Sequence, residues 1–336
     1  MSKNILLTGA SGGIGYKVFQ QLLESQKYNL TIFIRKSRKN IKRFKSFDNK
    51  VNIKFGDLTQ KEDLTQICEP YDAVIHLAAT IPPMAYKSQA NTHKVNVLGT
   101  QLLIRHFESY CPKAFFMFSS SVAIYGDRLK NPEIRVSDPL NEDDEDFYVQ
   151  SKIKAEQVVQ HSQLDWTIFR LTAILGVNNH KITGLMFHMP LDTPMEITTP
   201  SDAARAFVHG LEHKPLLSKK IFNLGGGISF RTSYRELLAE NFKINGLGKL
   251  NFPEKTFAEK NFHCGYMMDS DDLEDILHYR EHTLADYYRL NKEAVPAIRK
   301  LLTIPFRGFI KFLLRQMSEP LRAHKRNDKK ELERFF

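Results

Sequence analysis

Cysteines and long apolar runs are scarce in this chain of 336 residues. The three cysteines, Cys68, Cys111 and Cys264, lie far apart and form no pair motif, which argues against a disulfide framework or a zinc site. No window reaches the roughly 18 uninterrupted apolar residues of a membrane-spanning helix. The first residues also lack the layout of a signal peptide. These absences together predict a protein of the reducing cytoplasm.

Acidic residues are absent from one short stretch and outnumbered in another. Residues 35–45 carry seven bases and no acid, and residues 298–336 carry eleven bases and four acids. Each stretch is therefore +7 against a formal net charge of +10, so the rest of the chain carries −4. Because the basic charge has two separate locations, we expect no general nucleic-acid binding. The acids at residues 142–146 are expected to form a solvated surface, and no metal site is predicted.

A glycine-rich turn lies between a predicted strand and a predicted helix. Residues 4–8 form a short apolar run, Gly9, Gly12 and Gly15 follow, and apolar residues then recur at helical spacing. Strand, glycine turn and helix in this order are typical of dinucleotide-binding sites. Gly9 permits the tight turn, Gly12 lets a pyrophosphate approach the helix, and Gly15 lets the helix pack closely on the strand. This order favours dinucleotide binding over a plain glycine-containing loop.

A basic cluster follows the second predicted strand, residues 30–34. Folds that prefer NAD place an acidic residue at the end of this strand, where it binds the ribose 2′-hydroxyl. Here that position holds Arg35, followed by Lys36 and Arg38. A guanidinium suits a 2′-phosphate in both charge and geometry. The cluster therefore predicts NADP as the preferred cofactor, with NAD as the alternative. The remaining bases, up to Lys45, are expected to form an exposed helix face.

Further apolar runs alternate with segments of helical periodicity. This alternation predicts an α/β protein built on a doubly wound parallel sheet. Strands are predicted at residues 51–55, 73–79, 114–118 and 166–171, and helices at 61–68 and 91–110. His76 lies inside one of these apolar strands, so we expect it to be a hydrogen-bonded core histidine rather than a catalyst or a ligand.

Tyr148 and Lys152 are four residues apart in a segment that reads as helix, so their side chains share one helix face. A nearby ammonium favours the phenolate form of tyrosine. A tyrosine of lowered pKa can exchange a proton with a substrate hydroxyl or carbonyl. Ser121 follows the predicted strand at 114–118, so Ser121 and Tyr148 can both face the carboxyl end of the sheet, where such sheets bind ligands.

Taken together, these motifs resemble those of the extended short-chain dehydrogenase/reductase superfamily, of the NAD-dependent epimerase/dehydratase type. The resemblance lies in residues 8–15, 56–58, 76–79, 95–100, 118–121 and 125–126, in Tyr148 with Lys152, and later in Arg170 and residues 222–227. It implies a Rossmann-like domain over residues 1–176, to which residues 201–227 return. The final stretch of the chain has no counterpart in the family.

The resemblance implies a role for each matching position. Tyr148 is the expected acid/base, Lys152 would lower its pKa and bind the nicotinamide ribose, and Ser121 would hold the substrate oxygen. Asn96 matches a helix asparagine with a structural or relay role near the active site. The implied cofactor contacts are Gly9, Ser11, Gly12, Gly13, Ile14, Gly15, Arg35, Asp57, Leu58, Leu77, Ala78, Ala79, Tyr148 and Lys152.

Only a short segment, residues 171–201, separates Arg170 from the next family landmark, whereas members that act on nucleotide sugars generally carry a longer one. We expect residues 177–200 and 228–295 to form a small substrate-binding region. In it, Phe187 with the methionines Met186, Met189 and Met195 either lines an apolar pocket or belongs to the core.

The short segment favours an NADP-dependent oxidoreductase that moves a hydride between the nicotinamide and a carbonyl or alcohol of a small or apolar substrate. Two alternatives remain. One is a nucleotide-sugar epimerase or dehydratase with tightly bound NAD(P), and the other is a non-catalytic NADP-binding sensor. The resemblance also suggests a homodimer formed through two helices.

Residues 296–336 form a basic amphipathic extension. Apolar residues recur at helical spacing from Phe306 to Met317, and Arg307, Lys311 and Arg315 lie four apart on one flank. An apolar face bordered by bases is typical of a helix that lies in a membrane interface. Two interpretations stay open: peripheral membrane contact through residues 298–336, or a helix docked on its own domain.

Overall fold

The computed structural model describes residues 2–142, 146–177, 183–260 and 262–336. The middle of the predicted acidic surface, residues 143–145, and part of the predicted substrate segment, residues 178–182, lie outside the described residues.

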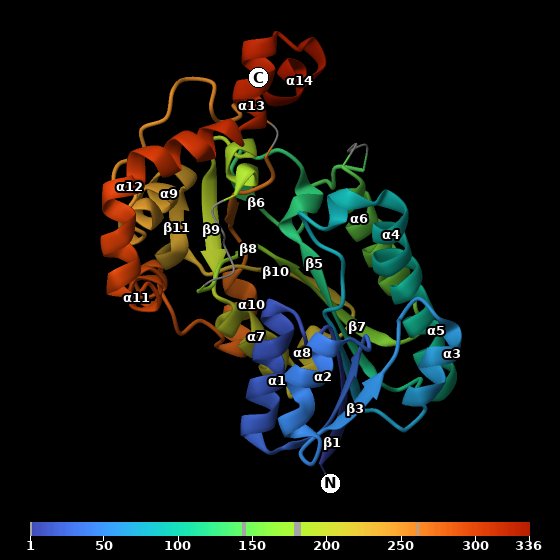
Figure 1. Cartoon of the computed structure of the whole chain (residues 1–336). Helices are drawn as coiled ribbons and strands as arrows, with labels where there is room; N and C mark the ends of the chain where they lie inside the picture. The colour runs from blue at the N-terminus through green and yellow to red at the C-terminus, as the bar shows by residue number, and fades with distance from the viewer. Residues whose placement is uncertain (1, 143–145, 178–182, 261) are drawn as a thin grey trace.

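A sheet of seven parallel strands forms the centre of the molecule (Figure 1). Its order is β10-β7-β5-β4-β1-β2-β3. The strands are β1 (Lys3–Thr8), β2 (Tyr28–Ile34), β3 (Asn52–Phe55), β4 (Ala73–His76), β5 (Phe115–Ser121), β7 (Asp165–Leu171) and β10 (Lys220–Leu224). The direction of winding reverses between β1 and β4, so their carboxyl ends flank the crevice where such sheets bind ligands. The predicted doubly wound parallel sheet is confirmed.

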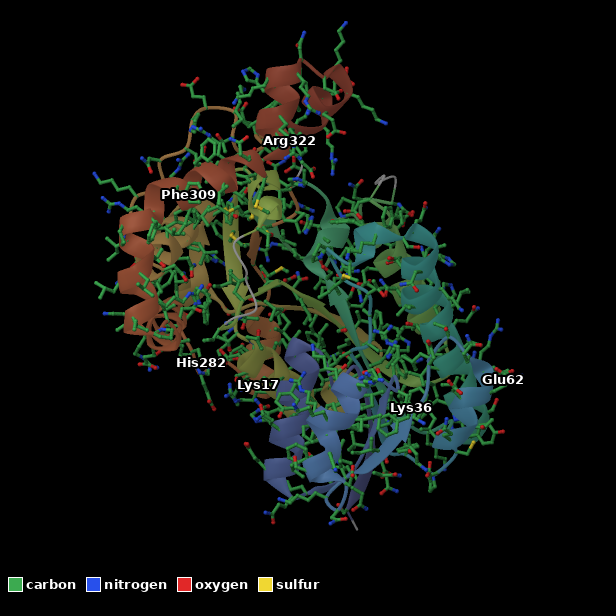
Figure 2. All side chains as sticks on the ribbon, viewed as in Figure 1. Lys17, Lys36, Glu62, His282, Phe309 and Arg322 are labelled. Carbon is green, nitrogen blue, oxygen red and sulfur yellow. The ribbon has the colours of Figure 1, made fainter. Side chains whose placement is uncertain are left out.

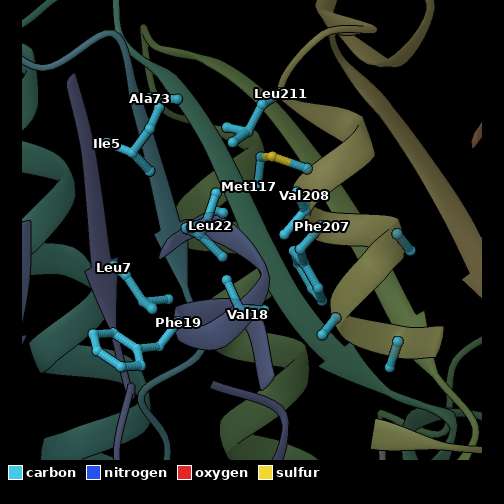
Figure 3. Packing of buried hydrophobic residues seen from close by; sticks show 14 of the residues in the cluster. Ile5, Leu7, Val18, Phe19, Leu22, Ala73, Met117, Phe207, Val208 and Leu211 are labelled. Carbon is cyan, nitrogen blue, oxygen red and sulfur yellow. The ribbon is translucent and has the colours of Figure 1, made fainter. Parts of the chain in front are cut away.

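Helices cover both faces of this sheet because its strands are apolar on both sides. On one face, α1 (Gly13–Ser25) and α7 (Pro200–Gly210) share a core with β1, in which Leu22 and Phe207 are buried (Figure 3). On the other face, α5 (Gly99–Tyr110) and α6 (Phe147–Gln160) bury Leu103 and Val159 against the sheet. The sheet thereby holds α6, which carries Tyr148, close to β5.

The helix predicted at residues 91–110 has three parts. It begins as α4 (Gln89–His93), continues through a π-helical turn at Lys94–Leu98, and ends as α5. Single π-helical turns inside α-helices often mark functional sites, since they re-aim a side chain. Here the turn contains Asn96.

A second, smaller layer packs beyond the carboxyl ends of the main sheet. Its three-stranded sheet has the order β11-β9-β8, with β8 (Ala173–Ile174), β9 (Pro194–Thr198) and β11 (Arg231–Ser233). The helices α9 (Tyr234–Ile244), α11 (Leu284–Ala294) and α12 (Ala297–Gln316) surround it (Figure 1). Phe187 and the methionines Met186, Met189 and Met195 are buried in this core. Of the two interpretations of these residues, the structure supports the core.

The remaining elements connect or cap these two layers. They are α2 (Arg38–Phe44), α3 (Lys61–Leu64), α8 (Lys214–Leu217), α10 (Asp271–Leu277), α13 (Glu319–Arg326) and α14 (Lys329–Phe335), and the paired short strands β6 (Glu133–Ile134) and β12 (Tyr266–Met267). Leu273 and Leu277 of α10 belong to the core of the main sheet. Helix α10 therefore packs on the larger layer, although it lies within residues 228–295.

Candidate active site

The glycine-rich turn after β1 has the shape that a pyrophosphate needs. Gly9 has a φ of +77°, and a Cβ there would lie 2.6 Å from the backbone nitrogen of Ala78. A Cβ on Gly15 would lie 2.1 Å from the carbonyl oxygen of Gly9, so only glycine permits this approach. Gly12 is the N-cap of α1 and has no side chain to cap the first-turn N–H groups. These donors suit an anionic group, so the turn fits a dinucleotide.

Arg35 is the arginine that the sequence predicts for the cofactor, and the structure adds a second one, Arg43, at the glycine-rich turn. Arg35 directly follows β2 and is exposed. Arg43 of α2 donates a hydrogen bond of 2.8 Å to the carbonyl oxygen of Ser11, and its guanidinium lies 3.7 Å from the ring centroid of Tyr16. The prediction that residues up to Lys45 form only an exposed helix face is therefore wrong for Arg43, because tertiary packing holds it against the turn.

The other predicted cofactor residues follow β3 and β4. An oxygen of Asp57 accepts a hydrogen bond of 2.9 Å from the backbone N–H of Thr59, and Leu58 is buried on the α5 face of the sheet. Leu77, Ala78 and Ala79 continue from β4 past the glycine-rich turn, where the Leu77 carbonyl and the Ala78 nitrogen lie closest to Gly9. All these segments lie at the carboxyl edge of the sheet, on both sides of the switch point.

The hydroxyl groups of Tyr148 and Ser121 meet at the same edge. Tyr148 is the second residue of α6. Asp146 caps this helix, because its side chain accepts a 2.8 Å hydrogen bond from the backbone N–H of Tyr148. Burial raises the pKa of Tyr148 to about 12, while its hydrogen bond with the Ser121 side chain opposes that rise. The structure therefore differs from the expected lowered pKa: Tyr148 is a protonated phenol at neutral pH.

Lys152 lies one turn further along α6 and is buried. Its Nζ donates a hydrogen bond of 2.6 Å to the carbonyl oxygen of Ser119 and lies 4.6 Å from the ring centroid of Phe118. Burial lowers the pKa of Lys152 to about 8, and the charge of Glu156 opposes this. The ammonium is thus held against β5, one turn of α6 beyond Tyr148.

Asn96 links the loop after β4 to α6. Its Oδ1 accepts a hydrogen bond of 2.7 Å from the backbone N–H of Thr80, and its Nδ2 donates to the Thr80 carbonyl at 3.0 Å and to Ser151 Oγ at 2.9 Å. Ser151 in turn donates to the carbonyl oxygen of Tyr148 at 2.7 Å. Asn96 therefore positions the helix that carries Tyr148 and Lys152 and is itself buried.

A buried ion pair between Arg170 and Glu156 fixes α6 to the sheet. Arg170 of β7 binds both carboxylate oxygens of Glu156, with its Nη2 at 2.9 Å from Oε2. Arg170 also donates to the hydroxyl of Tyr125 at 2.8 Å, and that hydroxyl donates to Asn223 Oδ1 at 2.8 Å. The sequence marks Arg170 only through the family resemblance, without a predicted ion-pair partner. Its partner could not be found from spacing, since Glu156 lies on a different element.

His76 is a hydrogen-bonded core residue, as expected. It is fully buried, with Nδ1 at 2.7 Å from Thr8 Oγ1 and Nε2 at 3.0 Å from Thr100 Oγ1. Burial, reinforced by the charge of Lys152, lowers the pKa of His76 to about 3. The imidazole is therefore neutral under physiological conditions. Among the described residues, no group of three or more His, Cys, Asp or Glu side chains could hold a metal ion.

Comparison with known proteins identifies a family for most of the chain. A model of the NAD dependent epimerase/dehydratase family matches residues 5–225. N-acetyl-alpha-D-glucosaminyl-diphospho-ditrans,octacis-undecaprenol 4-epimerase of Escherichia coli O157:H7 is 31% identical over 191 residues, which are 53% of this chain and 51% of that enzyme. The chain thus matches about half the length of that relative. D-erythronate dehydrogenase of Cupriavidus necator is 24% identical over 251 residues, covering 66% of this chain and 77% of that enzyme.

Solved structures show the same fold. A dTDP-glucose 4,6-dehydratase from Streptomyces venezuelae, solved with NAD bound, superposes with a TM-score of 0.70 at 20% identity, covering 86% of this chain and 96% of that one. UDP-glucose 4-epimerase from Thermotoga maritima superposes with a TM-score of 0.68 at 20% identity, covering 89% and 99%. At these identities the likeness concerns the fold, and the chemistry has to be argued from the site.

Proposed function

The chain belongs to the NAD dependent epimerase/dehydratase family, and from that membership we propose that it is an NADP-dependent oxidoreductase acting on a carbonyl or alcohol. The observation that carries the proposal is the pair of hydroxyls on Tyr148 and Ser121 at the carboxyl edge of the sheet, beside a glycine-rich turn that fits a dinucleotide. The residues that would hold the cofactor are Gly9, Ser11, Gly12, Gly13, Ile14, Gly15, Arg35, Asp57, Leu58, Leu77, Ala78, Ala79, Tyr148 and Lys152.

Positive charge near the adenosine end supports NADP over NAD. Arg35 follows β2 at the position where an acid would favour NAD. Arg43 adds a second guanidinium beside the glycine-rich turn and is held there by Ser11 and Tyr16. A planar guanidinium can bind a phosphate through two hydrogen bonds, which makes it the suitable residue for a 2′-phosphate.

The proton step follows from the ionisation of Tyr148. When bound, the nicotinamide supplies the hydride-transfer chemistry. Because burial holds Tyr148 as a phenol, its Oη can donate a proton to a substrate oxygen while Ser121 binds the same oxygen. The carbonyl then becomes an alcohol and Tyr148 becomes a phenolate, which solvent reprotonates. The buried Lys152 is charged below a pH of about 8 and would stabilise that phenolate.

A nucleotide-sugar or sugar-diphosphate epimerase is the second candidate, and the E. coli relative, an epimerase at 31% identity, favours it. In that case the phenolate form of Tyr148 would take a proton from a sugar hydroxyl and return it, with no net consumption of cofactor. The two candidates therefore use the same residues and differ in stoichiometry. A sensor would bind the cofactor without turnover, and the presence of both Tyr148 and Lys152 argues against it.

The proposal can be tested in two steps, first by cofactor selectivity and then by cofactor stoichiometry. A ligand that binds the native state raises the melting temperature, so NADPH should raise it more than NADH at equal concentration. Absorbance at 340 nm should then fall in proportion to substrate when a panel of small and apolar carbonyl compounds is supplied. A larger shift with NADH would overturn the NADP assignment. Conversion of a sugar diphosphate without loss of NADPH would establish the epimerase instead.

A further inference from the structure

The outward face of α12 is apolar over the whole length of the helix. Most members of this apolar stripe fall on one side of the helix, as on an amphipathic helix, and they are between 42% and 70% exposed. The exposed side chains are Ile298, Leu301, Leu302, Ile304, Phe306, Phe309, Phe312 and Leu313. Figure 2 shows Phe309 at the edge of the molecule opposite Glu62. Scattered exposed apolar residues are ordinary, but a contiguous face of this size indicates a binding surface.

The opposite face of α12 fixes the helix to the small C-terminal layer. Leu314 is buried and Ile310 packs against the same core. Directly after the helix, Ser318 is buried and its Oγ donates a 2.7 Å hydrogen bond to the carbonyl oxygen of Thr256. Because the inner face is already packed, α12 cannot rotate to bury its outer stripe. Docking on its own domain and an exposed apolar face therefore occur together, so the packed inner face is compatible with membrane contact through the outer one.

Three bases line a groove along one flank of the exposed stripe. The groove has a volume of about 420 Å³, and Arg307, Lys311 and Arg315 face it together with apolar walls from Phe252 and Phe312. Lys311 Nζ donates hydrogen bonds of 2.6 Å to the carbonyl oxygen of Lys249 and to Oδ1 of Asn251. Nε of Arg315 is buried and has no hydrogen-bond partner among the described residues. The groove thus presents positive charge that no acidic side chain lining it neutralises.

We propose that α12 docks this protein on an anionic phospholipid membrane, lying in the interface with its apolar stripe towards the acyl chains. The groove formed by Arg307, Lys311 and Arg315 would bind a lipid headgroup phosphate. Helix α12 carries five bases and no acid, which complements an anionic surface. A second copy of the chain is a poorer partner, because a twofold interface through α12 would bring like charges together. No helix among the described residues is long and apolar enough to cross a bilayer.

Flotation of the full chain with vesicles tests this contact. Vesicles of phosphatidylcholine with about one third phosphatidylglycerol should carry the protein upward, whereas pure phosphatidylcholine should carry far less. Raising the salt from 0.1 M to 1 M should release most of the bound protein, since the Debye length falls from about 10 Å to about 3 Å. Equal recovery in the soluble fraction with both kinds of vesicle would overturn the proposal.

Two sets of variants separate the apolar stripe from the basic groove. Phe306→Ser with Phe309→Ser, and separately Arg307→Gln with Lys311→Gln, should each reduce recovery with anionic vesicles roughly tenfold. The matched control is Lys61→Gln with Lys113→Gln, which removes the same charge from exposed sites on the large domain and should float like the wild type. If the control variant loses as much recovery with anionic vesicles, net charge alone explains the binding, and the assignment to α12 is overturned.

Sedimentation velocity tests whether a second copy of the chain, instead of a membrane, covers the apolar stripe. A dimer that the Phe306→Ser/Phe309→Ser variant abolishes, without any vesicle binding by the wild type, would assign the stripe to a second copy and refute membrane docking. Unchanged melting temperatures of the variants confirm that the exposed substitutions leave the fold intact. The assay needs no substrate, so its result is independent of the proposed catalytic activity.

Discussion

The Nζ of Lys152 lies 2.6 Å from the carbonyl oxygen of Ser119, so α6 is tied to β5 two residues before Ser121. This bond brings the helix that carries Tyr148 and the strand that carries Ser121 together at the carboxyl edge of the sheet. The ammonium is also buried there, and burial lowers its pKa to about 8. The buried position of Lys152 therefore makes the charge of the site sensitive to pH.

Binding of NADPH should therefore weaken as the pH rises through about 8, because Lys152 loses its proton there. Lys152→Met should bind NADPH more weakly at pH 7 and should lack this dependence. Fluorescence titration of NADPH between pH 6.5 and 9.5 measures both. A wild-type dissociation constant that stays constant across this range would contradict the role of Lys152 in binding the cofactor.

Tyr148→Phe should lower kcat by about 10²- to 10⁴-fold, the usual contribution of general acid–base catalysis. The phenyl ring keeps the packing of the buried side chain, so NADPH affinity and melting temperature should stay near the wild-type values. Ser121→Ala should lower kcat as well, since it removes the second hydroxyl at the substrate oxygen. Turnover that survives Tyr148→Phe unchanged would refute the assigned role of Tyr148 as the proton donor.

Arg35→Asp should reverse the preference between cofactors. The substitution removes a charge-assisted hydrogen bond of roughly 1.5–3 kcal/mol to the 2′-phosphate, so NADPH affinity should fall about 10- to 100-fold. The new carboxylate can accept from a ribose 2′-hydroxyl, so NADH affinity should rise. Lys39→Asp is the matched control, because Lys39 is an exposed base on α2. If Lys39→Asp loses a similar amount of NADPH affinity, the effect of Arg35→Asp is due to general electrostatics and not to a contact with the 2′-phosphate.

Glu156→Gln should destabilise the protein by roughly 3–5 kcal/mol, because it leaves the buried guanidinium of Arg170 without its carboxylate. Replacing both partners with methionine should cost clearly less than the sum of the two single changes. Urea unfolding measures both. Glu240→Gln provides the comparison, since its pair with Lys243 is on the surface and should contribute at most about 1 kcal/mol.

His76 should make the protein sensitive to acid. Its pKa is about 3 in the folded state and near 6.5 in the unfolded chain, so the unfolded state binds more protons between these values. Stability is fully present above pH 6.5 and is lost as the pH falls towards 3, by up to roughly 5 kcal/mol. In His76→Gln the free energy of unfolding should fall less steeply between pH 6.5 and 4. An exposed control, His93→Gln, should follow the wild type.

The sequence alone was sufficient for the fold, and it predicted the local parts of the candidate site. Apolar runs of strand length, glycines at fixed offsets and the four-residue spacing of Tyr148 and Lys152 are short-range patterns, because backbone geometry relates neighbours directly. The predicted doubly wound parallel sheet followed from the alternation of such runs. The position of Arg35 is likewise a property of the end of one strand.

Only the tertiary structure decided how charges pair across elements. Arg43 reaches Ser11 across 32 positions in the chain, and Arg170 reaches Glu156 from a neighbouring strand, so neither contact has a local signature. The pKa of Tyr148 is raised where the four-residue spacing predicted it to be lowered, because burial disfavours the charged phenolate. For α12, the periodic pattern left open whether the helix contacts a membrane or docks on its own domain. The packing of Ile310 and Leu314 in the small C-terminal layer shows which side of the helix is buried and which side stays exposed.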